Sequence, residues 1–366
     1  MVPHESHELS NPFCFADGTP VLSSDDWQRR RLEIRDLVVA LEYGGLPPVP
    51  PVTRGEMLHV SEVRGAGGVT FQSFRVHTGP GCCFTFLMTA LVPPGEGPFP
   101  VVVSGDACWR YVTDQVAMEV LRRGMVLVQF NRTEIAPDVR GSERDSGIYP
   151  LYPGGVFGAL AAWAWGYHRC IDALVEMPFV DRERIGVVGH SRGGKASLLA
   201  GATDERIALT GANNSGCGGA GSFRWQAPGA EALRDILGAF PYWFGPQLPA
   251  FIGRDAELPF DQHLLKALVA PRALYTTEAL GDLWANPSGT WQTHRAAREV
   301  FRFLGAEDRI GIAFRAGGHD HGMQDWCAFL DFMDCQLCGR PIPAPDERRP
   351  FAVLPPAFSW ETPPRR

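Results

Sequence analysis

The alternation of apolar and polar residues changes character near residue 98. Before that point, residues 24–43 carry Ser/Asp start signals and apolar side chains at helical spacing, which predicts an amphipathic helix. The proline-rich run GGLPPVPPV then breaks the helix and predicts an extended arm, so that residues 1–55 form a helix and arm. Three runs of strand character follow within residues 56–93, and the glycine and proline between them favour antiparallel hairpins.

After residue 98, short apolar runs alternate with helical patterns. The runs are rich in β-branched residues and are typical of strands buried on both faces. They are FPVVVSGD, MVLVQFN, RIGVVGH, RIALTGANNSG, APRALYTTEA and IGIAFRAGG. Helical patterns separate them over residues 111–124, 157–177, 191–202 and 290–305, and a last one covers about 323–338. Strands joined by crossover helices predict a mostly parallel sheet covered by helices on both faces.

Two segments interrupt this alternation. Residues 215–262 are rich in glycine, proline and aromatic residues, and we expect them to form loops or a cap over the carboxyl edge of the sheet. Residues 341–366 are rich in proline and are expected to form an extension that lies on the surface or is loosely ordered. The remaining pattern predicts a single catalytic domain over residues 1–340.

A candidate nucleophile lies where the third buried strand meets its helix. Residues 189–193 read Gly-His-Ser-Arg-Gly, a G-x-S-x-G pattern between a strand and a helix. Small residues must flank the serine because the turn is tight, and the helix N-terminus behind it favours developing negative charge. The pattern in this context predicts an α/β-hydrolase fold with Ser191 as the nucleophile.

A serine hydroxyl needs a base, and the base needs an orienting acid. His319 follows the last strand and its glycine turn, which is the place of the base in this fold, and we favour it over His321. For the acid, Asp282 and Glu278 both follow the strand RALYTT, and Asp282 is favoured because the loop before a helix begins there. His190 is expected to point away from the site.

Two cations follow the serine. The backbone N–H of Arg192 lies where an oxyanion-hole donor belongs, and its guanidinium could add charge-assisted hydrogen bonds. Lys195 lies about one helical turn further and can face the same cleft. Cations oppose the dipole at a helix N-terminus, so an ion pair on the first turn explains them poorly and a role at the site is favoured.

The chain resembles the glucuronoyl esterases, the fifteenth family of carbohydrate esterases, and in particular their bacterial members. The resemblance runs from about residue 11 to about residue 340. It rests on the motifs VVGHSRGGKASLLAGATDERIALTGANNSGCGG, FPYWF, LPFDQHLLKALVAPRALY, DLWANP and GGHD…DW. It implies an α/β-hydrolase that cleaves esters between lignin alcohols and the 4-O-methyl-glucuronic acid groups of xylan.

The resemblance also implies roles for individual residues. Ser191 and His319 match the nucleophile and base, and Arg192 matches the residue that lines the oxyanion hole. Lys195 would bind hydroxyls of the uronic acid, Trp284 would contact the sugar, and Glu231 matches a sugar-binding glutamate less closely. Fungal members carry the catalytic glutamate in a segment like ESG, where this chain has Asn214-Ser215-Gly216. The acid therefore falls to Asp282, with Glu278 as the alternative.

Composition limits the partners of the protein. A formal charge of −7 and a pI near 5.8 argue against nucleic acid and anionic membranes. No run of about 18 apolar residues predicts a membrane span. The first residues lack a basic segment followed by an apolar one, which predicts either a protein of the cytoplasm or a chain whose leader has been removed; the resemblance favours a secreted or periplasmic protein.

The odd number of cysteines, nine, leans toward a reducing compartment. Cys335 and Cys338 are interpreted as helix-face thiols, and no metal or organic cofactor is expected. We expect a uronic acid ester or a glucuronoxylan-derived molecule as substrate, and a monomer. Two other functions stay open: a general acetyl or aryl esterase on this fold, and a catalytically silent carbohydrate-binding relative.

Overall fold

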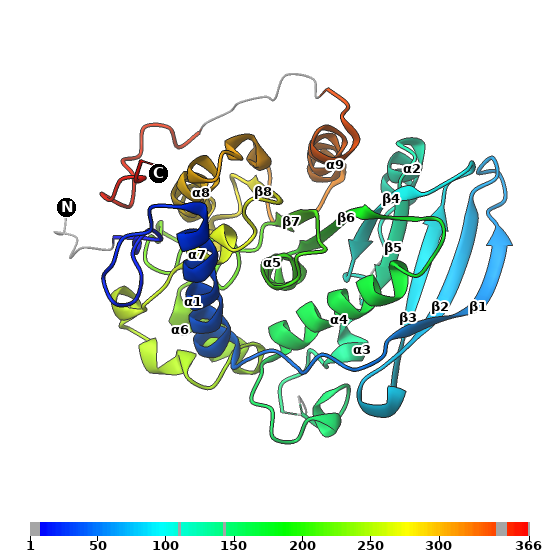
Figure 1. Ribbon diagram of the computed structural model, residues 1–366, viewed down its shortest axis with the longest axis horizontal. Helices are drawn as coiled ribbons and strands as arrows, with labels where there is room; N and C mark the ends of the chain where they lie inside the picture. Colours follow the sequence, from blue (N-terminus) through cyan, green and yellow to red (C-terminus); the bar gives the residue numbers. More distant parts are fainter. Residues whose placement is uncertain (1–7, 109–110, 142–143, 342–349, 365–366) are drawn as a thin grey trace.

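The computed structural model of the protein describes residues 8–108, 111–141, 144–341 and 350–364. Within these residues, nine strands form one sheet in the order β1-β2-β3-β5-β4-β6-β7-β8-β9. The six strands β5, β4, β6, β7, β8 and β9 run parallel to one another. Beside them, β1, β2 and β3 form an antiparallel extension. The sheet has the mostly parallel, helix-covered form that the sequence predicts (Figure 1).

The antiparallel extension comes from the predicted hairpins. It consists of β1 (Arg54–Glu62), β2 (Thr70–Thr78) and β3 (Phe84–Val92), and β3 also pairs antiparallel with β5 (Val126–Phe130). Phe74 of β2 lies opposite Met88 of β3, and both are buried on the same face. Every residue of β1 is exposed, so β1 forms the outer edge of the sheet.

The parallel strands supply the buried center of the sheet. They are β4 (Phe99–Ser104), β5, β6 (Val180–His190), β7 (Leu209–Asn213), β8 (Ala273–Ala279) and β9 (Ile310–Arg315). Val101, Val102 and Val103 of β4 are all fully buried, because helices cover both faces. Parallel pairing brings the carboxyl ends of β6, β7, β8 and β9 to one edge, side by side.

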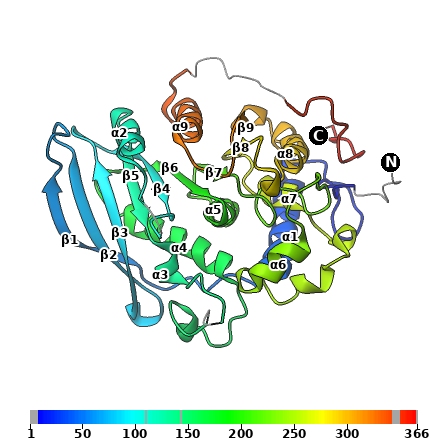
Figure 2. The same ribbon diagram turned by 180° about the vertical axis from the view of Figure 1, so that it is seen from behind.

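Helices cover the two faces of the sheet in separate groups (Figures 1 and 2). One face carries α2 (Asp114–Arg122) and α9 (Met323–Cys338), whose apolar side chains pack on Val102, Leu127 and Val188. The other face carries α4 (Ala159–Leu174) and α5 (Arg192–Thr203), followed outward by α1 (Ser24–Tyr43), α7 (Gln262–Ala267) and α8 (Pro287–Phe303).

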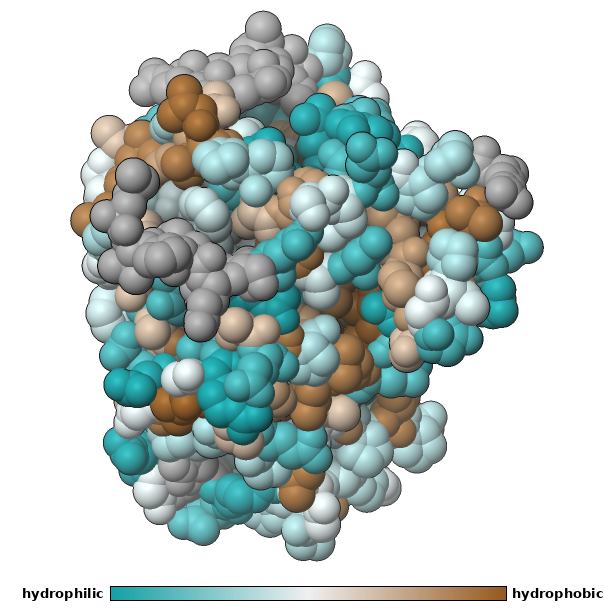
Figure 3. Space-filling model, turned by 90° about the vertical axis from the view of Figure 1, so that its left-hand side faces the viewer, coloured by the Kyte–Doolittle hydropathy of each residue, from teal (hydrophilic) through white to brown (hydrophobic). Residues whose placement is uncertain are grey.

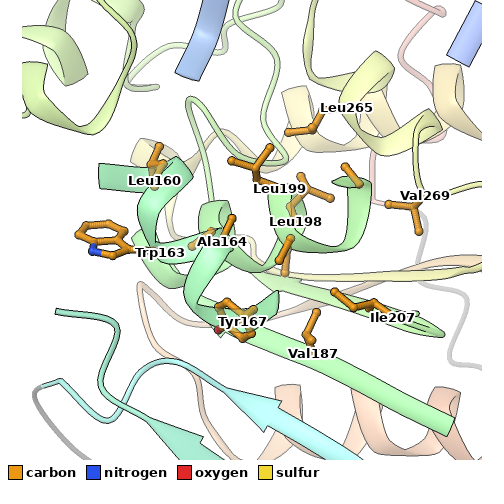
Figure 4. Close-up of a cluster of buried hydrophobic side chains, with 14 of the residues drawn as sticks. Leu160, Trp163, Ala164, Tyr167, Val187, Leu198, Leu199, Ile207, Leu265 and Val269 are labelled. Atoms are coloured by element: carbon orange, nitrogen blue, oxygen red, sulfur yellow. The ribbon is translucent and has the colours of Figure 1, made fainter. Parts of the chain in front are cut away.

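The larger core lies under α4 and α5. Trp163 and Tyr167 of α4, Leu198 and Leu199 of α5 and Val187 of β6 pack together in it (Figure 4). Fifteen of the 16 residues of α4 are buried, which accounts for its almost continuous apolar sequence. None of the described helices is both long and apolar enough to cross a bilayer.

The first helix begins and ends where the sequence predicts. Ser23 accepts a hydrogen bond from the N–H of Asp26, and the Asp26 carboxylate accepts one from the N–H of Ser23 at 3.1 Å. This capping box satisfies N–H groups that have no partner within the helix. Gly44 then ends the helix in the left-handed conformation, with φ 71°.

The segment 215–262 contains one short α-helix, α6 (Leu233–Ala239), and the 3₁₀ turns η3 (Pro241–Trp243), η4 (Leu248–Phe251) and η5 (Asp255–Glu257). Two further short helices, α3 (Arg132–Ile135) and α7, were not predicted. Each of these helices has at most seven residues, which is too short for a hydrophobic period to appear in the sequence. Tertiary contacts, not local sequence pattern, stabilise them.

Part of the predicted C-terminal extension lies beside the N-terminal segment. Residues 342–349 and 365–366 fall outside the described residues, whereas residues 350–364 lie on the surface against α8 and residues 8–10. Trp360 donates its indole N–H to the carbonyl of Leu9 at 2.8 Å, and Leu9 donates to the carbonyl of Ala357 at 2.8 Å. On this side of the molecule polar and apolar residues are interleaved (Figure 3).

Candidate active site

Four neighbouring strands deliver the candidate residues to one edge of the sheet. Ser191 follows β6, Asn214 follows β7, Asp282 follows β8 and His319 follows β9. Because these strands are adjacent and parallel, residues far apart in the sequence meet at their carboxyl ends.

Ser191 occupies a strained turn between β6 and α5. Its backbone has φ 54° and ψ −120°, a conformation that residues other than glycine rarely adopt and that costs on the order of 1–3 kcal/mol. A Cβ atom on Gly189 would collide with the carbonyl of Gly193, and one on Gly193 would collide with the Asp106 carboxylate. Both glycines of the G-x-S-x-G pattern are therefore required sterically, and the turn is held by a 2.9 Å hydrogen bond from Ser191 N to Asn213 O.

His319 and Asp282 form a hydrogen-bonded pair. Nδ1 of His319 lies 2.6 Å from Oδ2 of Asp282, whose side chain is 5% exposed. Since an ionised carboxylate only accepts hydrogen bonds, Nδ1 carries the proton and Nε2 is the nitrogen that can accept one. Burial opposes ionisation of Asp282, but the hydrogen bonds from His319 and Asn214 outweigh it and lower the pKa of this carboxyl.

Asn214 is a partner of the acid that sequence reasoning missed. Its Nδ2 donates to Asp282 Oδ2 at 2.7 Å, and its Oδ1 accepts from the N–H of Ala279 at 3.1 Å. That backbone donor fixes which end of the amide faces the carboxylate. Asn214 has φ 42°, in the left-handed region that asparagine tolerates.

The alternative acid, Glu278, lies elsewhere. It is fully buried within β8, and within the described part of the chain neither of its carboxylate oxygens has a hydrogen-bond partner. Burial raises the pKa of Glu278 to about 8 and lowers that of the buried amine of Lys266 to about 7. Of the two carboxylates weighed from the sequence, Asp282 is the one in contact with His319.

The other two histidines near the site form a row of rings with His319. The His190 ring centroid lies 4.6 Å from that of His319 and 5.8 Å from that of His321, which in turn stacks on Trp326 at 4.7 Å. His190 bonds to Asn213 Oδ1 at 2.5 Å, and burial lowers its pKa. His190 is thus a hydrogen-bonded histidine, and its ring lies against that of His319.

Arg192 is held in place by groups from two other segments. Its guanidinium pairs with Asp138 at 2.7 Å and lies 4.7 Å from the ring centroid of Trp243 and 5.0 Å from that of Phe240. Tyr242 and Trp243 also donate to Asp138, at 2.9 and 2.8 Å. The Asp138 carboxylate therefore offsets the unfavourable interaction between the Arg192 cation and the dipole of α5. This ion-pair partner lies outside the helix and not on its first turn.

Lys195 points under the loop that follows β7. Its ammonium donates to the carbonyls of Ser215 and Cys217, at 2.5 and 2.6 Å, and the side chain is buried. Burial lowers its pKa, while Glu231 opposes this shift. Carbonyls among the described residues thus accept from two of its three N–H donors, which leaves one for another acceptor.

Glu231 and Trp284 lie next to each other at this end of the site. The N–H of Glu231 donates to the carbonyl of Trp284 at 3.0 Å. Glu231 is 8% exposed and burial raises its pKa, whereas Trp284, in the 3₁₀ turn η6 (Leu283–Ala285), is 53% exposed. An exposed aromatic ring beside a buried carboxyl and a buried amine is an arrangement suited to a sugar, which offers an apolar face and several hydroxyls.

Over the described ranges, no group of three or more His, Cys, Asp or Glu side chains could hold a metal ion. Cys335 and Cys338 lie on α9 as free thiols.

Comparison with known proteins identifies a family. The sequence model of the family described as "Glucuronyl esterase, fungi" matches residues 78–305, which is more than half of the chain. The 4-O-methyl-glucuronoyl methylesterase of Podospora anserina is 34% identical over 86% of this chain, and this chain covers 64% of that protein. The 4-O-methyl-glucuronoyl methylesterase 1 of Phanerochaete chrysosporium is 33% identical, with coverage of 90% and 68%.

Solved structures give the same result. A carbohydrate esterase family 15 glucuronoyl esterase from Caldicellulosiruptor kristjansonii superposes with a TM-score of 0.85 at 33% identity, and 97% of each chain is covered. A serine-to-alanine variant of the glucuronoyl esterase from Sporotrichum thermophile, in complex with methyl 4-O-methyl-β-D-glucopyranuronate, gives a TM-score of 0.77 at 27% identity, with 93% and 90% covered.

Proposed function

The chain belongs to the glucuronoyl esterase family, carbohydrate esterase family 15, and from this we propose that it hydrolyses esters of 4-O-methyl-glucuronic acid, such as those that link xylan to lignin alcohols. The observation that carries the proposal is the His319–Asp282 pair beside the strained Ser191 turn. The names of the relatives indicate that the acid half of the ester is a glucuronic acid. The residues around Ser191 indicate that the reaction is ester hydrolysis through a serine nucleophile.

The proposed reaction has two halves. In the first, Ser191 Oγ attacks the uronoyl carbonyl while Nε2 of His319 takes its proton, and His319 then gives that proton to the departing alcohol. In the second, water attacks the uronoyl–serine ester, His319 again takes and returns a proton, and free uronate leaves. Asp282 keeps Nδ1 protonated and stabilises the imidazolium that forms in each half.

Arg192 stabilises the negative charge that develops on the carbonyl oxygen during the reaction. It is the first residue of α5, and the N–H of a first helical residue has no acceptor within the helix. Its guanidinium, fixed by Asp138 and the Trp243 ring, adds a positive charge beside that position. Because these donors are held before the substrate arrives, they need little reorganisation during the reaction.

Lys195, Glu231 and Trp284 are the proposed contacts to the uronic acid ring. The third N–H of Lys195 and the carboxyl of Glu231 can bond to ring hydroxyls, and Trp284 offers its exposed face to the sugar.

The test compares methyl or benzyl glucuronate with p-nitrophenyl acetate as substrates. Wild type is expected to prefer the uronate esters, Ser191→Ala to be inactive, and Asp282→Asn to lose about 10³–10⁴ in kcat, because the wrong histidine tautomer forms. Glu278→Gln is the matched control and should retain activity. Loss of activity in Glu278→Gln with retention in Asp282→Asn would reverse the assignment of the acid.

Other results would select the other two functions. Rapid turnover of the acetate ester with none of the uronate esters would indicate a general esterase. If wild type and Ser191→Ala were equally inactive on every ester, the protein would be a carbohydrate-binding relative.

A further inference from the structure

The base of the site lies on a loop after β9, and its ring needs more than one contact to be fixed. The side chain of His319 is 44% exposed. Its hydrogen bond to Asp282, at 2.6 Å from Nδ1, holds one corner of the imidazole. A ring held at one corner can still swing about that bond, and such a movement would carry Nε2 away from the hydroxyl of Ser191. A contact against the face of the ring prevents this movement.

His190 supplies a contact of this kind. Its ring centroid lies 4.6 Å from that of His319, with an angle of 46° between the two planes. His190 is the last residue of β6 and directly precedes Ser191. The contact therefore joins the turn that carries the nucleophile to the loop that carries the base.

Asn213, at the end of β7, determines the orientation of the His190 ring. Its Nδ2 donates to Thr277 Oγ1 at 2.9 Å, so its Oδ1 faces His190 as an acceptor. Nδ1 of His190 lies 2.5 Å from this oxygen and is therefore the nitrogen that carries the proton. The backbone oxygen of Asn213 also accepts from the N–H of Ser191 at 2.9 Å. One residue thus holds both the nucleophile turn and the ring beside the base.

Packing alone does not fix the His190 ring. A cavity of about 170 Å³ borders His190 together with Asp320 and Trp326, so part of the ring faces open space. The last side-chain torsion of histidine has a broad preference, and the bond to Asn213 therefore restricts how the ring can turn.

The charge of His190 matters because His319 becomes positive during the proposed reaction. The titratable groups around His190 are His319, His321, Asp106 and Asp320. Burial has the largest effect and lowers the pKa of His190, whereas the hydrogen bond to Asn213 and the two carboxylates oppose this shift. Of these carboxylates, Asp106 is already paired with Arg132.

Resting on the proposed function, we propose that His190 is a positioning residue for the reaction: its neutral ring, fixed by Asn213, holds His319 in line with Ser191. A neutral ring does not oppose the charge that His319 acquires, whereas a protonated ring at this distance would repel it. His190 acts through His319 and exchanges no proton with the substrate.

The first experiment separates the ring of His190 from its hydrogen bond. His190→Phe keeps a ring but cannot donate, and His190→Asn keeps an N–H donor near the place of Nδ1 but has no ring. We expect His190→Asn to lower kcat about tenfold with little change in KM, because a displaced base slows the reaction and not the binding. His190→Phe should keep about a third or more of the wild-type kcat, because its ring still limits the movement of His319.

The rates are measured with methyl glucuronate and with p-nitrophenyl acetate. His190 acts on the base, so kcat should fall on both esters. His168→Asn is the matched control, since His168 is also buried, and it bonds to the carbonyl of Ala200 at 3.2 Å, toward the other end of α5 from Ser191. This control should lower the thermal midpoint but leave kcat unchanged.

A second experiment observes the His190 ring directly. In wild type labelled with ¹⁵N-histidine, the signals of His190 are those lost in either of its variants. NMR at pH 7 should show a neutral ring with its proton on Nδ1.

A His190 ring protonated on both nitrogens, or on Nε2 alone, would overturn the proposal. So would a wild-type kcat in His190→Asn, or a kcat of His190→Phe no higher than that of His190→Asn. Failure of the proposed function would look different: wild type would hydrolyse the acetate ester and no uronate ester, and the comparison of the His190 variants would still be complete on the acetate.

Discussion

At the scale of the residue, one amide determines how the acid of the site is oriented. Asn214 and His319 both donate to Oδ2 of Asp282, at 2.7 and 2.6 Å, so one carboxylate oxygen receives two hydrogen bonds. The N–H of Ala279 prevents the amide from turning over, because it occupies the Asn214 oxygen. Asn214 is therefore a positioning residue, acting on the reaction through Asp282.

Replacing this amide should move the acid side of the pH–rate profile. In Asn214→Asp a second carboxyl lies within hydrogen-bond distance of Asp282, and two such groups cannot both be ionised at little cost. One of them keeps its proton to higher pH, so the acidic limb of kcat/KM should shift upward. Asn214→Gly, which also tolerates a positive φ, removes the donor without adding a charge and should lower kcat about tenfold.

The measurement is kcat/KM for methyl glucuronate from pH 4 to pH 9. An unchanged limb in Asn214→Asp, together with wild-type kcat in Asn214→Gly, would show that Asp282 is positioned without this residue. The thermal midpoint of each variant separates this effect from loss of the fold.

At the scale of the element, three parts of the chain meet at the turn between β6 and α5: the turn itself, Asp106 and Arg132. A Cβ on Gly193 would meet the carboxylate of Asp106, and that carboxylate is already held by Arg132 and by the N–H of His190. The N-terminal end of α5 can therefore approach Asp106, two residues beyond the end of β4, only because residue 193 lacks a side chain.

Gly193→Ala should consequently disturb both stability and rate. Overpacking of this kind costs about 1–3 kcal/mol, and the displaced turn also moves Ser191, so we expect a lower thermal midpoint and a fall in kcat of at least about tenfold. Gly238→Ala in α6 is the control, since a Cβ there meets nothing within 4 Å. Calorimetry and steady-state rates on methyl glucuronate report the two effects, and wild-type values for Gly193→Ala would contradict the steric argument.

Elements with a long hydrophobic period were predictable, and the partners of individual side chains were not. The helix at residues 24–43 and the serine turn follow from local pattern, because both are built from neighbours in the sequence. The pairing of Asp282 with His319 spans 37 residues, and the sequence offered both Glu278 and Asp282 after the strand RALYTT, with Asp282 favoured only because the loop before the next helix begins there. Only the three-dimensional structure separates a buried strand residue from one that reaches the histidine.

At the scale of the whole molecule, buried acids make stability depend on pH. Burial raises the pKa of Glu42 and of Glu278 from 4.5 to about 8. The folded protein therefore retains protons that the unfolded chain releases between pH 4.5 and 8. The advantage this gives the folded state is complete below about pH 4.5 and is lost as the pH rises toward 8.

The contribution of these two acids to the free energy of unfolding should thus fall between pH 5 and 8, by up to about 1.4 kcal/mol per pH unit for each group. Glu42→Gln removes one titrating group but keeps an acceptor for Gln262, which now donates at 2.9 and 3.0 Å, so its slope should be shallower. Denaturant unfolding at several pH values measures this, with the exposed Glu96→Gln as control. A slope equal to that of wild type would exclude Glu42 as a source.

The hydrogen bonds between residues 8–10 and residues 357–360 have a consequence for engineering circular permutants of this protein. Both segments lie on the same side of the molecule, held by the bonds between Leu9, Ala357 and Trp360 (Figure 1). A short peptide could join them, and a new start could be opened in an exposed turn such as residues 64–68 of the β1–β2 hairpin. Such a circular permutant would have its new termini in the β1–β2 turn. The enzyme could then be attached to a surface or to a fusion partner through its antiparallel edge.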